Sequence, residues 1–195
     1  EMVDWDALKR FKQNALNPNH PHTMGSAEQP ETFFQHREAC NTAYLETPDL
    51  VNKYMEMVNA KIGTDYKPFN YYGAADAEEL IDYLNARGRK VGIVEVHLYR
   101  PFSAKHLLAV MPKSVKTISV IDRTKEPGSI GEPLYLDVVA ALKGTEFESV
   151  KVLNGRYGLG SKNTTPADIF AIFANEDKAG FTVGIVDDVT NTSLP

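Results

Sequence analysis

The sequence has little cysteine, no long hydrophobic run and no excess of positive charge. Cys40 is the only cysteine among 195 residues, so an internal disulfide, a cysteine-based zinc site and a protein-ligated iron–sulfur cluster are all excluded. No apolar run approaches the ~18–20 residues of a membrane span, and no signal-like segment opens the chain. The net charge of -5 disfavours nucleic acid and anionic membranes as partners, because both attract a basic excess. These absences predict a protein of a reducing compartment, the cytoplasm.

The composition is that of an ordinary globular protein. Hydrophobic residues make up 43% and charged residues 24% of the chain, which is too apolar for intrinsic disorder. At ~150 residues per domain, the length corresponds to about 1.3 domains. The chain begins with Glu1 and ends in a turn-like run at 191–195, so we expect it to be cut from a longer polypeptide.

The first third of the chain is predicted to be helical. Residues 4–16 carry an apolar stripe at helical spacing, formed by Trp5, Leu8, Phe11 and Ala15. A linker rich in proline and polar residues follows at 17–22, and a second helix is expected at about 31–45. Thr47 as N-cap and Pro48 at the first helical position predict a third helix, which ends before Gly63. Residues 1–66 are therefore interpreted as a helical arm or linker.

Residues 67–195 show short β-rich runs that alternate with helices, a pattern typical of a parallel sheet with crossover connections. Strands are expected at 91–98, 117–121, 150–153 and 181–186, and helices at 77–87, 103–110, 134–142 and 166–175. This order predicts an α/β domain with an open, mostly parallel sheet in three layers. The helix at 77–87 has almost no strand in front of it, although such a sheet normally begins with one.

The loops that leave the carboxyl ends of the expected strands are rich in Arg, Lys, Gly and Pro. In open α/β sheets this edge carries the ligand or partner. The loops are 99–103, 122–133 and 154–165, and their charged candidates for domain docking are Arg100, Arg123, Lys125, Glu126 and Arg156. The functional alternatives are a charge-paired docking surface and an anion site. The structural alternative is a set of solvated loops held by salt bridges worth under ~1 kcal/mol each.

The 154–165 loop has some features of a phosphate cradle, because three glycines and Lys162 precede a helix N-terminus. In a P-loop, however, lysine directly follows the last glycine, whereas here Ser161 stands between Gly160 and Lys162. Asn163 likewise breaks the dinucleotide-binding pattern. A structural turn before a capped helix is the favoured interpretation. A free-standing nucleotide- or phosphate-binding α/β protein that uses this loop is the alternative function.

The other metal-ligating or nucleophilic side chains lack the spacing of a catalytic or metal site. Zinc requires three or four convergent ligands, and a catalytic thiolate needs a neighbouring base. Neither pattern is formed by His20, His22, His36 and Cys40. We expect His97 to be a hydrogen-bonded sheet residue, and Asp187-Asp188 to be either a cation site or an acidic turn. No catalytic, cofactor-binding or metal-binding residue is assigned.

Several long motifs carry a family resemblance. They are NPNHP at 17–21, FQHREA at 34–39, LYRPF at 98–102, DRTKEPG at 122–128, GEPLYLDV at 131–138, GRYGLGSK at 155–162, DDVT at 187–190 and SLP at 193–195. In this order the sequence resembles pyruvate:ferredoxin (flavodoxin) oxidoreductase, also called pyruvate synthase, over essentially its whole length. The segment is similar to the family's second domain, whose fold resembles the carboxy-terminal domain of transketolase.

The resemblance implies an activity for the whole enzyme but not for this chain. The family oxidatively decarboxylates pyruvate to acetyl-CoA with thiamine diphosphate, Mg²⁺ and [4Fe–4S] clusters, uses coenzyme A as substrate, and passes electrons to ferredoxin or flavodoxin. The Gly-Asp-Gly…Asn motif that holds Mg-diphosphate is missing here, so the isolated chain is expected to be inactive and free of cofactors. Its implied role is that of a non-catalytic structural and docking domain. Its partners would be the other domains of the enzyme and, through them, the second copy of a homodimer.

The sequence departs from the family at one place. The family has a β-strand and a glycine-bearing turn between the positions that match Glu78 and Glu79, and both are missing here. This is the same strand whose absence stands out before the helix at 77–87. The alternatives are a real deletion that leaves the sheet one strand short, which is favoured, and a disordered segment that is missing from the numbered sequence. A Cα separation between Glu78 and Glu79 well above ~3.8 Å would contradict the deletion.

Overall fold

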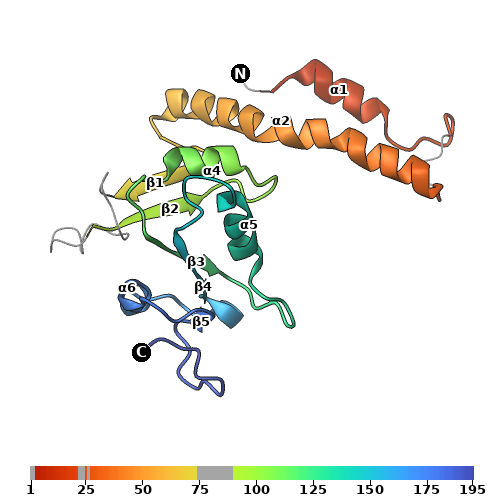
Figure 1. Ribbon diagram of the computed structural model, residues 1–195. Helices are drawn as coiled ribbons and strands as arrows, with labels where there is room; N and C mark the ends of the chain where they lie inside the picture. The colour runs from red at the N-terminus through yellow and green to blue at the C-terminus, as the bar shows by residue number, and fades with distance from the viewer. Residues whose placement is uncertain (1–2, 22–24, 26, 74–89) are drawn as a thin grey trace. The chain divides into compact units, whose positions relative to one another are not determined.

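The computed structural model describes residues 3–21, 25, 27–73 and 90–195 (Figure 1). The expected helix at 77–87 and the junction between Glu78 and Glu79 lie outside these residues. By its internal contacts the chain divides into two compact units, Glu1–Thr42 and Ala43–Pro195. This division falls inside a helix, whereas the predicted boundary at 66/67 marks the start of the α/β pattern and stays a prediction.

The first unit contains helix α1, Trp5–Gln13, and the beginning of helix α2, Pro30–Ile62. Asp4 is the N-cap of α1, where its carboxylate accepts a hydrogen bond from the Ala7 N–H at 2.8 Å. Such a cap satisfies one of the N–H groups that a helix start leaves unpaired. The described part of this unit contains no buried residue, and only Ala7 and Leu8 are partly covered.

Helix α2 corrects one prediction, because the sequence indicates two helices with a new start at Thr47. The structure has a single helix of 33 residues, with Pro48 buried in its interior. The Thr47 hydroxyl donates to the Ala43 carbonyl at 2.7 Å and so bonds back one turn instead of capping a new helix. A Thr-Pro pair can stand at the start of a helix or inside a continuous one, so the pair alone does not show which of the two is present.

The second half of α2 belongs to the α/β unit and is fixed there by polar contacts. The Asp49 carboxylate accepts from Lys105 Nζ at 2.8 and 2.9 Å. After the helix, the Asn59 amide donates to the Tyr66 carbonyl and accepts from the Tyr66 N–H, both at 2.8 Å. These bonds hold the turn that leads from α2 into the first strand.

That first strand is a second correction. Residues Phe69–Gly73 form strand β1, which pairs antiparallel with β2, Gly92–Val96. The sequence predicts β2 but assigns no strand to 69–73 and counts β2 as part of the parallel sheet. In the described residues β1 and β2 instead make a two-stranded sheet of their own. A five-residue run that is buried at one end and exposed at the other lacks the alternation that marks a half-buried strand.

The predicted parallel sheet is confirmed for the other three strands, although the last of them is shorter than the expected 181–186. They are β3, Thr117–Asp122, β4, Lys151–Arg156, and β5, Phe181–Thr182, in the order β3-β4-β5. The predicted helices of this region are also present, as α4, Ala104–Val110, α5, Pro133–Leu142, and α6, Pro166–Ala174.

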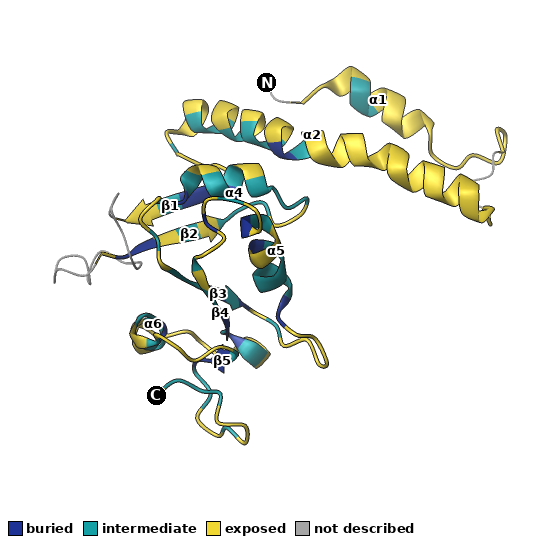
Figure 2. Cartoon of the chain, in the orientation of Figure 1, coloured by how far each residue is buried: buried dark blue, intermediate teal, exposed yellow. Residues whose placement is uncertain are grey.

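Two hydrophobic clusters on the two faces of the parallel sheet make the α/β unit a three-layer structure (Figures 1 and 2). On one face Val120 and Val152 pack with Val138 of α5. On the other, Leu153 packs with Ile172 of α6 and with Phe181. The open three-layer α/β fold expected from the sequence is thus confirmed. In the described part of the chain, no helix combines the length and the apolar character needed to cross a membrane.

Candidate docking site at the carboxyl edge of the parallel sheet

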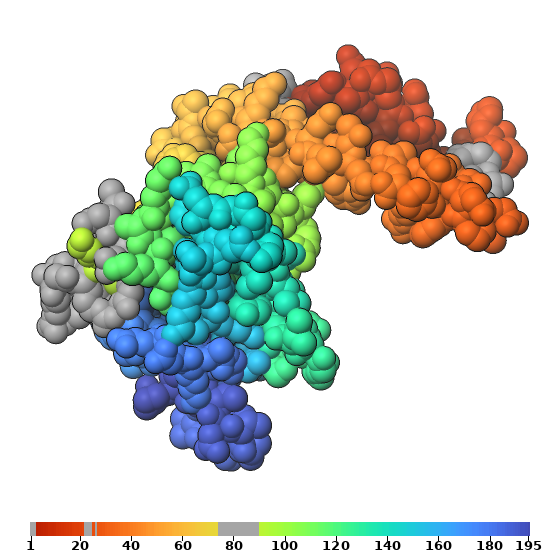
Figure 3. All heavy atoms as spheres, viewed as in Figure 1, coloured from red at the N-terminus to blue at the C-terminus, as the bar shows by residue number. Residues whose placement is uncertain are grey.

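The register of the parallel sheet brings its three strand ends together. Asp122 at the end of β3 is paired with Arg156 at the end of β4, and Arg156 with Thr182 at the end of β5. The loops 123–132, 157–165 and 183–192 leave from this edge. In Figure 3 the loop near residue 128 and the loop near residue 188 protrude from the body of the α/β unit.

The centre of this edge is an ion pair between Glu132 and Arg156. Arg156 Nε donates to Glu132 Oε1 at 2.5 Å, and Arg156 Nη1 donates to the Gly180 carbonyl at 2.9 Å. The other carboxylate oxygen of Glu132 accepts from the Glu126 N–H at 2.7 Å. The Glu132 side chain is 1% exposed. This one carboxylate therefore connects the 123–132 loop to the end of β4 and, through Arg156, to the turn before β5.

The surroundings of Glu132 decide its charge. Burial alone would raise the pKa of this carboxyl, but hydrogen bonds from Arg156 and the Glu126 N–H, together with the charges of Arg156 and Lys125, hold its pKa below the ordinary value of 4.5. Glu132 is therefore ionised at neutral pH. A buried carboxylate that is fully hydrogen-bonded in this way fixes the geometry of the groups around it.

Asp122 fixes the start of helix α5. Its two carboxylate oxygens accept from the Leu134 N–H at 2.9 Å and the Tyr135 N–H at 3.2 Å. Burial raises the pKa of Asp122, an effect that these two hydrogen bonds oppose and the nearby charges of Glu132 and Asp137 strengthen. The side chain acts as a cap supplied by a neighbouring strand, since Glu132, the residue before the helix, makes no capping bond of its own.

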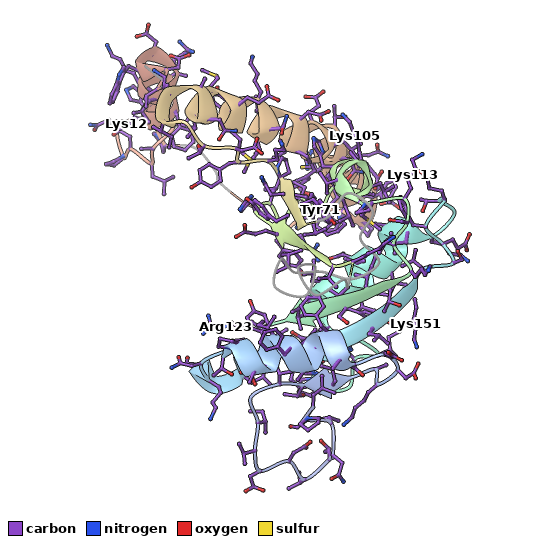
Figure 4. All side chains as sticks on the ribbon, turned by 90° about the vertical axis from the view of Figure 1, so that its left-hand side faces the viewer. Lys12, Tyr71, Lys105, Lys113, Arg123 and Lys151 are labelled. Carbon is purple, nitrogen blue, oxygen red and sulfur yellow. The ribbon has the colours of Figure 1, made fainter. Side chains whose placement is uncertain are left out.

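Arg123 connects two of the loops. Its Nε donates to the Gly158 carbonyl at 3.4 Å. Gly158 has a φ of +61°, and a Cβ added there would lie 3.1 Å from Arg123 Nε, so glycine suits this position for conformational and steric reasons alike. Arg123 as a whole residue is exposed, and it is labelled in Figure 4.

The structure brings four of the five predicted docking residues to this edge. Lys125 Nζ donates to the Glu126 carbonyl at 3.0 Å and lies 3.8 Å from Glu132 Oε1. Lys125 and Glu126 are exposed as residues, whereas Arg156 points inward and its side chain is 11% exposed. Arg156 therefore stabilises the edge from within, and the charges available on its surface are those of Arg123, Lys125 and Glu126.

Arg100, the fifth predicted residue, makes its contacts elsewhere. Its guanidinium pairs with the Asp137 carboxylate of α5 and lies over the Tyr99 ring, with 4.2 Å between Cζ and the ring centroid. Arg100 Nη2 also donates to the Tyr99 hydroxyl at 3.2 Å. These contacts connect the loop after β2 to α5.

Three exposed aliphatic residues are the main feature of the edge that sequence reasoning missed. Ile130 in the 123–132 loop is 93% exposed, and Val186 and Val189 in the 183–192 loop are 94% and 92% exposed. The signal in the sequence is an aliphatic side chain within a loop of glycine, proline and charged residues, which supply no apolar neighbours to bury it. Nearly full exposure of aliphatic side chains on two loops of one sheet edge is typical of a surface that meets a partner.

The second of these loops is ordered by Asp188. Its Oδ1 accepts from the Thr190 N–H at 3.0 Å and the Thr190 hydroxyl at 2.9 Å, and its Oδ2 accepts from the Ser193 N–H at 2.5 Å. The bond from Ser193 is the main reason that the pKa of Asp188 lies well below its usual range. Of the two sequence interpretations, an acidic turn is the one whose contacts the structure shows.

The 154–165 loop has the geometry of a turn before a capped helix. Thr165 and Asp168 form a capping box at the start of α6, in which the Thr165 N–H donates to the Asp168 carboxylate at 2.7 Å. A carboxylate thus already occupies the position where a helix would attract an anion. This arrangement favours the structural interpretation of the loop over a phosphate site.

Ser103, His106 and Asp49 form a contact chain that the sequence does not reveal. The Ser103 hydroxyl lies 2.9 Å from His106 Nδ1, and His106 Nε2 lies 3.2 Å from Asp49 Oδ1. A Ser-His-Asp hydrolase has the opposite nitrogen order, with serine at Nε2. Ser103 is moreover the N-cap of α4, so we assign this chain of contacts to packing of α2 on α4.

The remaining histidine and cysteine expectations have ordinary structural outcomes. His97 Nδ1 lies 2.9 Å from the Lys67 carbonyl, so His97 is hydrogen-bonded as expected, but it lies just after β2 and not within a strand. The Cys40 thiol is exposed on α2 and donates to the His36 carbonyl at 3.3 Å. Within the described ranges, no group of three or more His, Cys, Asp or Glu side chains could hold a metal ion.

Fold and edge together define a three-layer α/β domain whose loop edge is internally braced and apolar at its tips. Residues 72–169 match the family model described as pyruvate:ferredoxin oxidoreductase core domain II. The chain belongs to this family. It is 50% identical to the pyruvate-flavodoxin oxidoreductase of Enterobacter agglomerans and to the pyruvate:ferredoxin oxidoreductase of Moorella thermoacetica, over 100% of its own length. It is also 46% identical to the mitochondrial pyruvate dehydrogenase [NADP(+)] of Euglena gracilis, again over its whole length.

The chain corresponds to a small part of each relative. It spans 18% of the Enterobacter and Moorella proteins and 12% of the Euglena protein. The alignment with the Enterobacter protein covers 212 positions, 17 more than the 195 residues of the chain. That relative therefore has residues without a counterpart here. Their location between Glu78 and Glu79 stays a prediction.

Proposed function

We propose that this chain is a non-catalytic structural and docking domain of a pyruvate:ferredoxin (flavodoxin) oxidoreductase. The observation that carries the proposal is the exposure of Ile130, Val186 and Val189 on two loops of one sheet edge. The loop with Ile130 is held by Glu132, and the loop with the two valines by Asp188. Braced loops with bare aliphatic tips suit a surface that packs against a neighbouring domain. Arg123, Lys125 and Glu126 supply polar contacts around these tips, and Arg100 and Arg156 hold the elements behind them.

On this proposal, the catalytic reaction takes place in the other domains of the enzyme. The whole protein would oxidatively decarboxylate pyruvate to acetyl-CoA with thiamine diphosphate, Mg²⁺, [4Fe–4S] clusters and coenzyme A, all bound outside this chain. It would act as a homodimer in the cytoplasm and pass electrons to ferredoxin or flavodoxin. The names of the relatives, which combine pyruvate with flavodoxin, ferredoxin or NADP(+), support this reading.

Charge reversal in the full-length enzyme tests the docking role. Arg123→Glu places a negative charge at the proposed interface and should weaken assembly of the enzyme and lower its turnover. Lys113→Glu is the matched control, since Lys113 precedes β3 at the opposite edge of the sheet and its side chain is 82% exposed (Figure 4). Intact assembly and normal turnover of the Arg123 variant would remove Arg123 from the interface.

Calorimetric titration separates this proposal from a free-standing nucleotide- or phosphate-binding protein. The 195-residue chain is titrated with thiamine diphosphate, coenzyme A and ATP in turn. The docking role predicts no appreciable heat from any of them. A saturable heat that disappears in a Lys162→Ala variant would instead assign a ligand to the 154–165 loop.

A further inference from the structure

The first half of helix α2 exposes an aromatic face. Phe33, Phe34, Tyr44 and Leu45 are 51%, 57%, 61% and 78% exposed, and we call these four residues the α2 apolar face. Phe33 and Tyr44 are eleven residues apart, about three helical turns, as are Phe34 and Leu45, so each pair shares one side of the helix. Figure 2 shows this half of α2 as exposed throughout.

Helix α1, in the first unit, also exposes apolar side chains. Trp5 is 61% and Phe11 72% exposed, and Leu16 just after the helix is 73% exposed. The described residues of Glu1–Thr42 include none that is buried. A helix gains most of its stability by packing an apolar stripe, and short helices without such packing are marginal in water. The described part of the unit therefore carries apolar side chains of the kind that helices pack, and leaves them largely exposed.

We propose that the α2 apolar face is a docking surface for another domain of the same polypeptide. This inference rests on the proposed role of the chain as a docking domain. The curated relatives align with this chain from end to end, yet the chain spans only 18% of the Enterobacter and Moorella proteins. More than four fifths of such a polypeptide is thus available to cover the face. A segment of the same chain is present at high effective concentration, which favours it over a separate molecule.

The side chains on the face indicate the chemistry of the surface that covers it. The Arg37 guanidinium lies over the Phe33 ring, with 5.2 Å between Cζ and the ring centroid, and so holds a charge beside the aromatic surface. A complementary surface is concave and apolar, with a carboxylate or backbone carbonyl that reaches Arg37. Aromatic and arginine side chains are the residue types enriched at the centres of protein interfaces.

Photo-crosslinking in the full-length enzyme tests the proposal. A photoreactive phenylalanine analogue replaces Phe33 in one preparation and Ala39 in another. Ala39 is exposed and lies six residues from both Phe33 and Leu45, on the side of the helix opposite the α2 apolar face. After irradiation, denaturing electrophoresis and peptide mass spectrometry identify the product. We expect the Phe33 probe to form a crosslink within a single polypeptide, to a peptide outside these 195 residues, with at least fivefold higher yield than the Ala39 probe.

Two other outcomes would overturn the inference. A covalent dimer of two enzyme chains would show that a second copy covers the face. A crosslink yield at Phe33 no higher than at Ala39 would show that the face is uncovered. Either result would leave the docking role of the sheet edge intact, because Arg123→Glu tests that role at different residues and by assembly of the enzyme.

Discussion

At the scale of single residues, Glu132 holds the loop edge together. It is among the most buried side chains of the molecule, and its two oxygens receive hydrogen bonds from Arg156 and from the backbone of its own loop. A buried ion pair of this kind contributes little net stability when compared with a well-packed apolar pair. Removal of one partner is costly, however, because the other charge stays buried.

Substitution of Glu132 should therefore be strongly destabilising. We predict that Glu132→Gln lowers the free energy of unfolding by about 3–5 kcal/mol, the range found when one partner of a buried pair is removed. Urea unfolding of the 195-residue chain, followed by circular dichroism, measures this loss. Glu148→Gln is the control, because Glu148 forms an exposed ion pair with Lys143 and should cost under ~1 kcal/mol. Equal losses for the two variants would contradict the bracing role of Glu132.

The same residue predicts a pH dependence. Because the folded-state pKa of Glu132 lies below its ordinary value of 4.5, its ionised form stabilises the fold above pH 4.5. That contribution is lost as pH falls through the folded pKa. The stability difference between the wild type and Glu132→Gln should thus be full at pH 7 and shrink below pH 4.5. Urea unfolding at several pH values tests this, and a difference that stays constant down to pH 3 would show that Glu132 is not the titrating group.

At the scale of elements, β4 and β5 approach each other so closely that their contact depends on a glycine. A Cβ added to Gly155 in β4 would lie 2.2 Å from the Cζ of Phe181 in β5. Phe181 is fully buried and belongs to the cluster beneath α6. The Phe181 ring of β5 thus fills the space that a side chain at position 155 of β4 would need.

Gly155→Ala should disturb this contact without changing any surface residue. We predict a loss of about 1–3 kcal/mol in the free energy of unfolding, typical of an overpacked core. Phe181→Leu in the same chain should restore part of the loss, because the smaller side chain makes room for the new methyl group. A double-mutant cycle by urea unfolding measures this coupling, and strictly additive losses would contradict the proposed ring contact.

The elements also show where sequence reasoning succeeds and fails. The strands β3 and β4 and the helices α5 and α6 were predicted within a few residues, since their apolar spacing and their Pro starts are local signals. The continuous helix α2 and strand β1 were missed, because Thr47-Pro48 and the run at 69–73 depend on contacts from elsewhere in the fold. The loop positions predict which charged residues could dock a neighbouring domain, and that role stays a prediction. The inward turn of Arg156 depends on Glu132, which lies 24 residues away along the chain.

At the scale of the whole molecule, the chain combines a braced α/β unit with an N-terminal unit whose described residues include none that is buried. The α/β unit has two hydrophobic clusters and a carboxyl edge with three bare aliphatic side chains. The N-terminal unit exposes aromatic side chains instead. Both features are expected of a segment whose neighbours lie in the remainder of a much longer polypeptide, as the 18% coverage of two relatives indicates.

Hydrogen–deuterium exchange of the full-length enzyme tests the docking role most directly, by comparison with the isolated 195-residue chain. The amides of the loops 123–132 and 183–192, where Ile130, Val186 and Val189 lie exposed, are followed by peptide mass spectrometry. Peptides from the buried strand β4 serve as the internal reference. If neighbouring domains cover this edge, both loops should exchange at least tenfold more slowly in the full-length enzyme. Equal exchange in the two proteins would contradict the account.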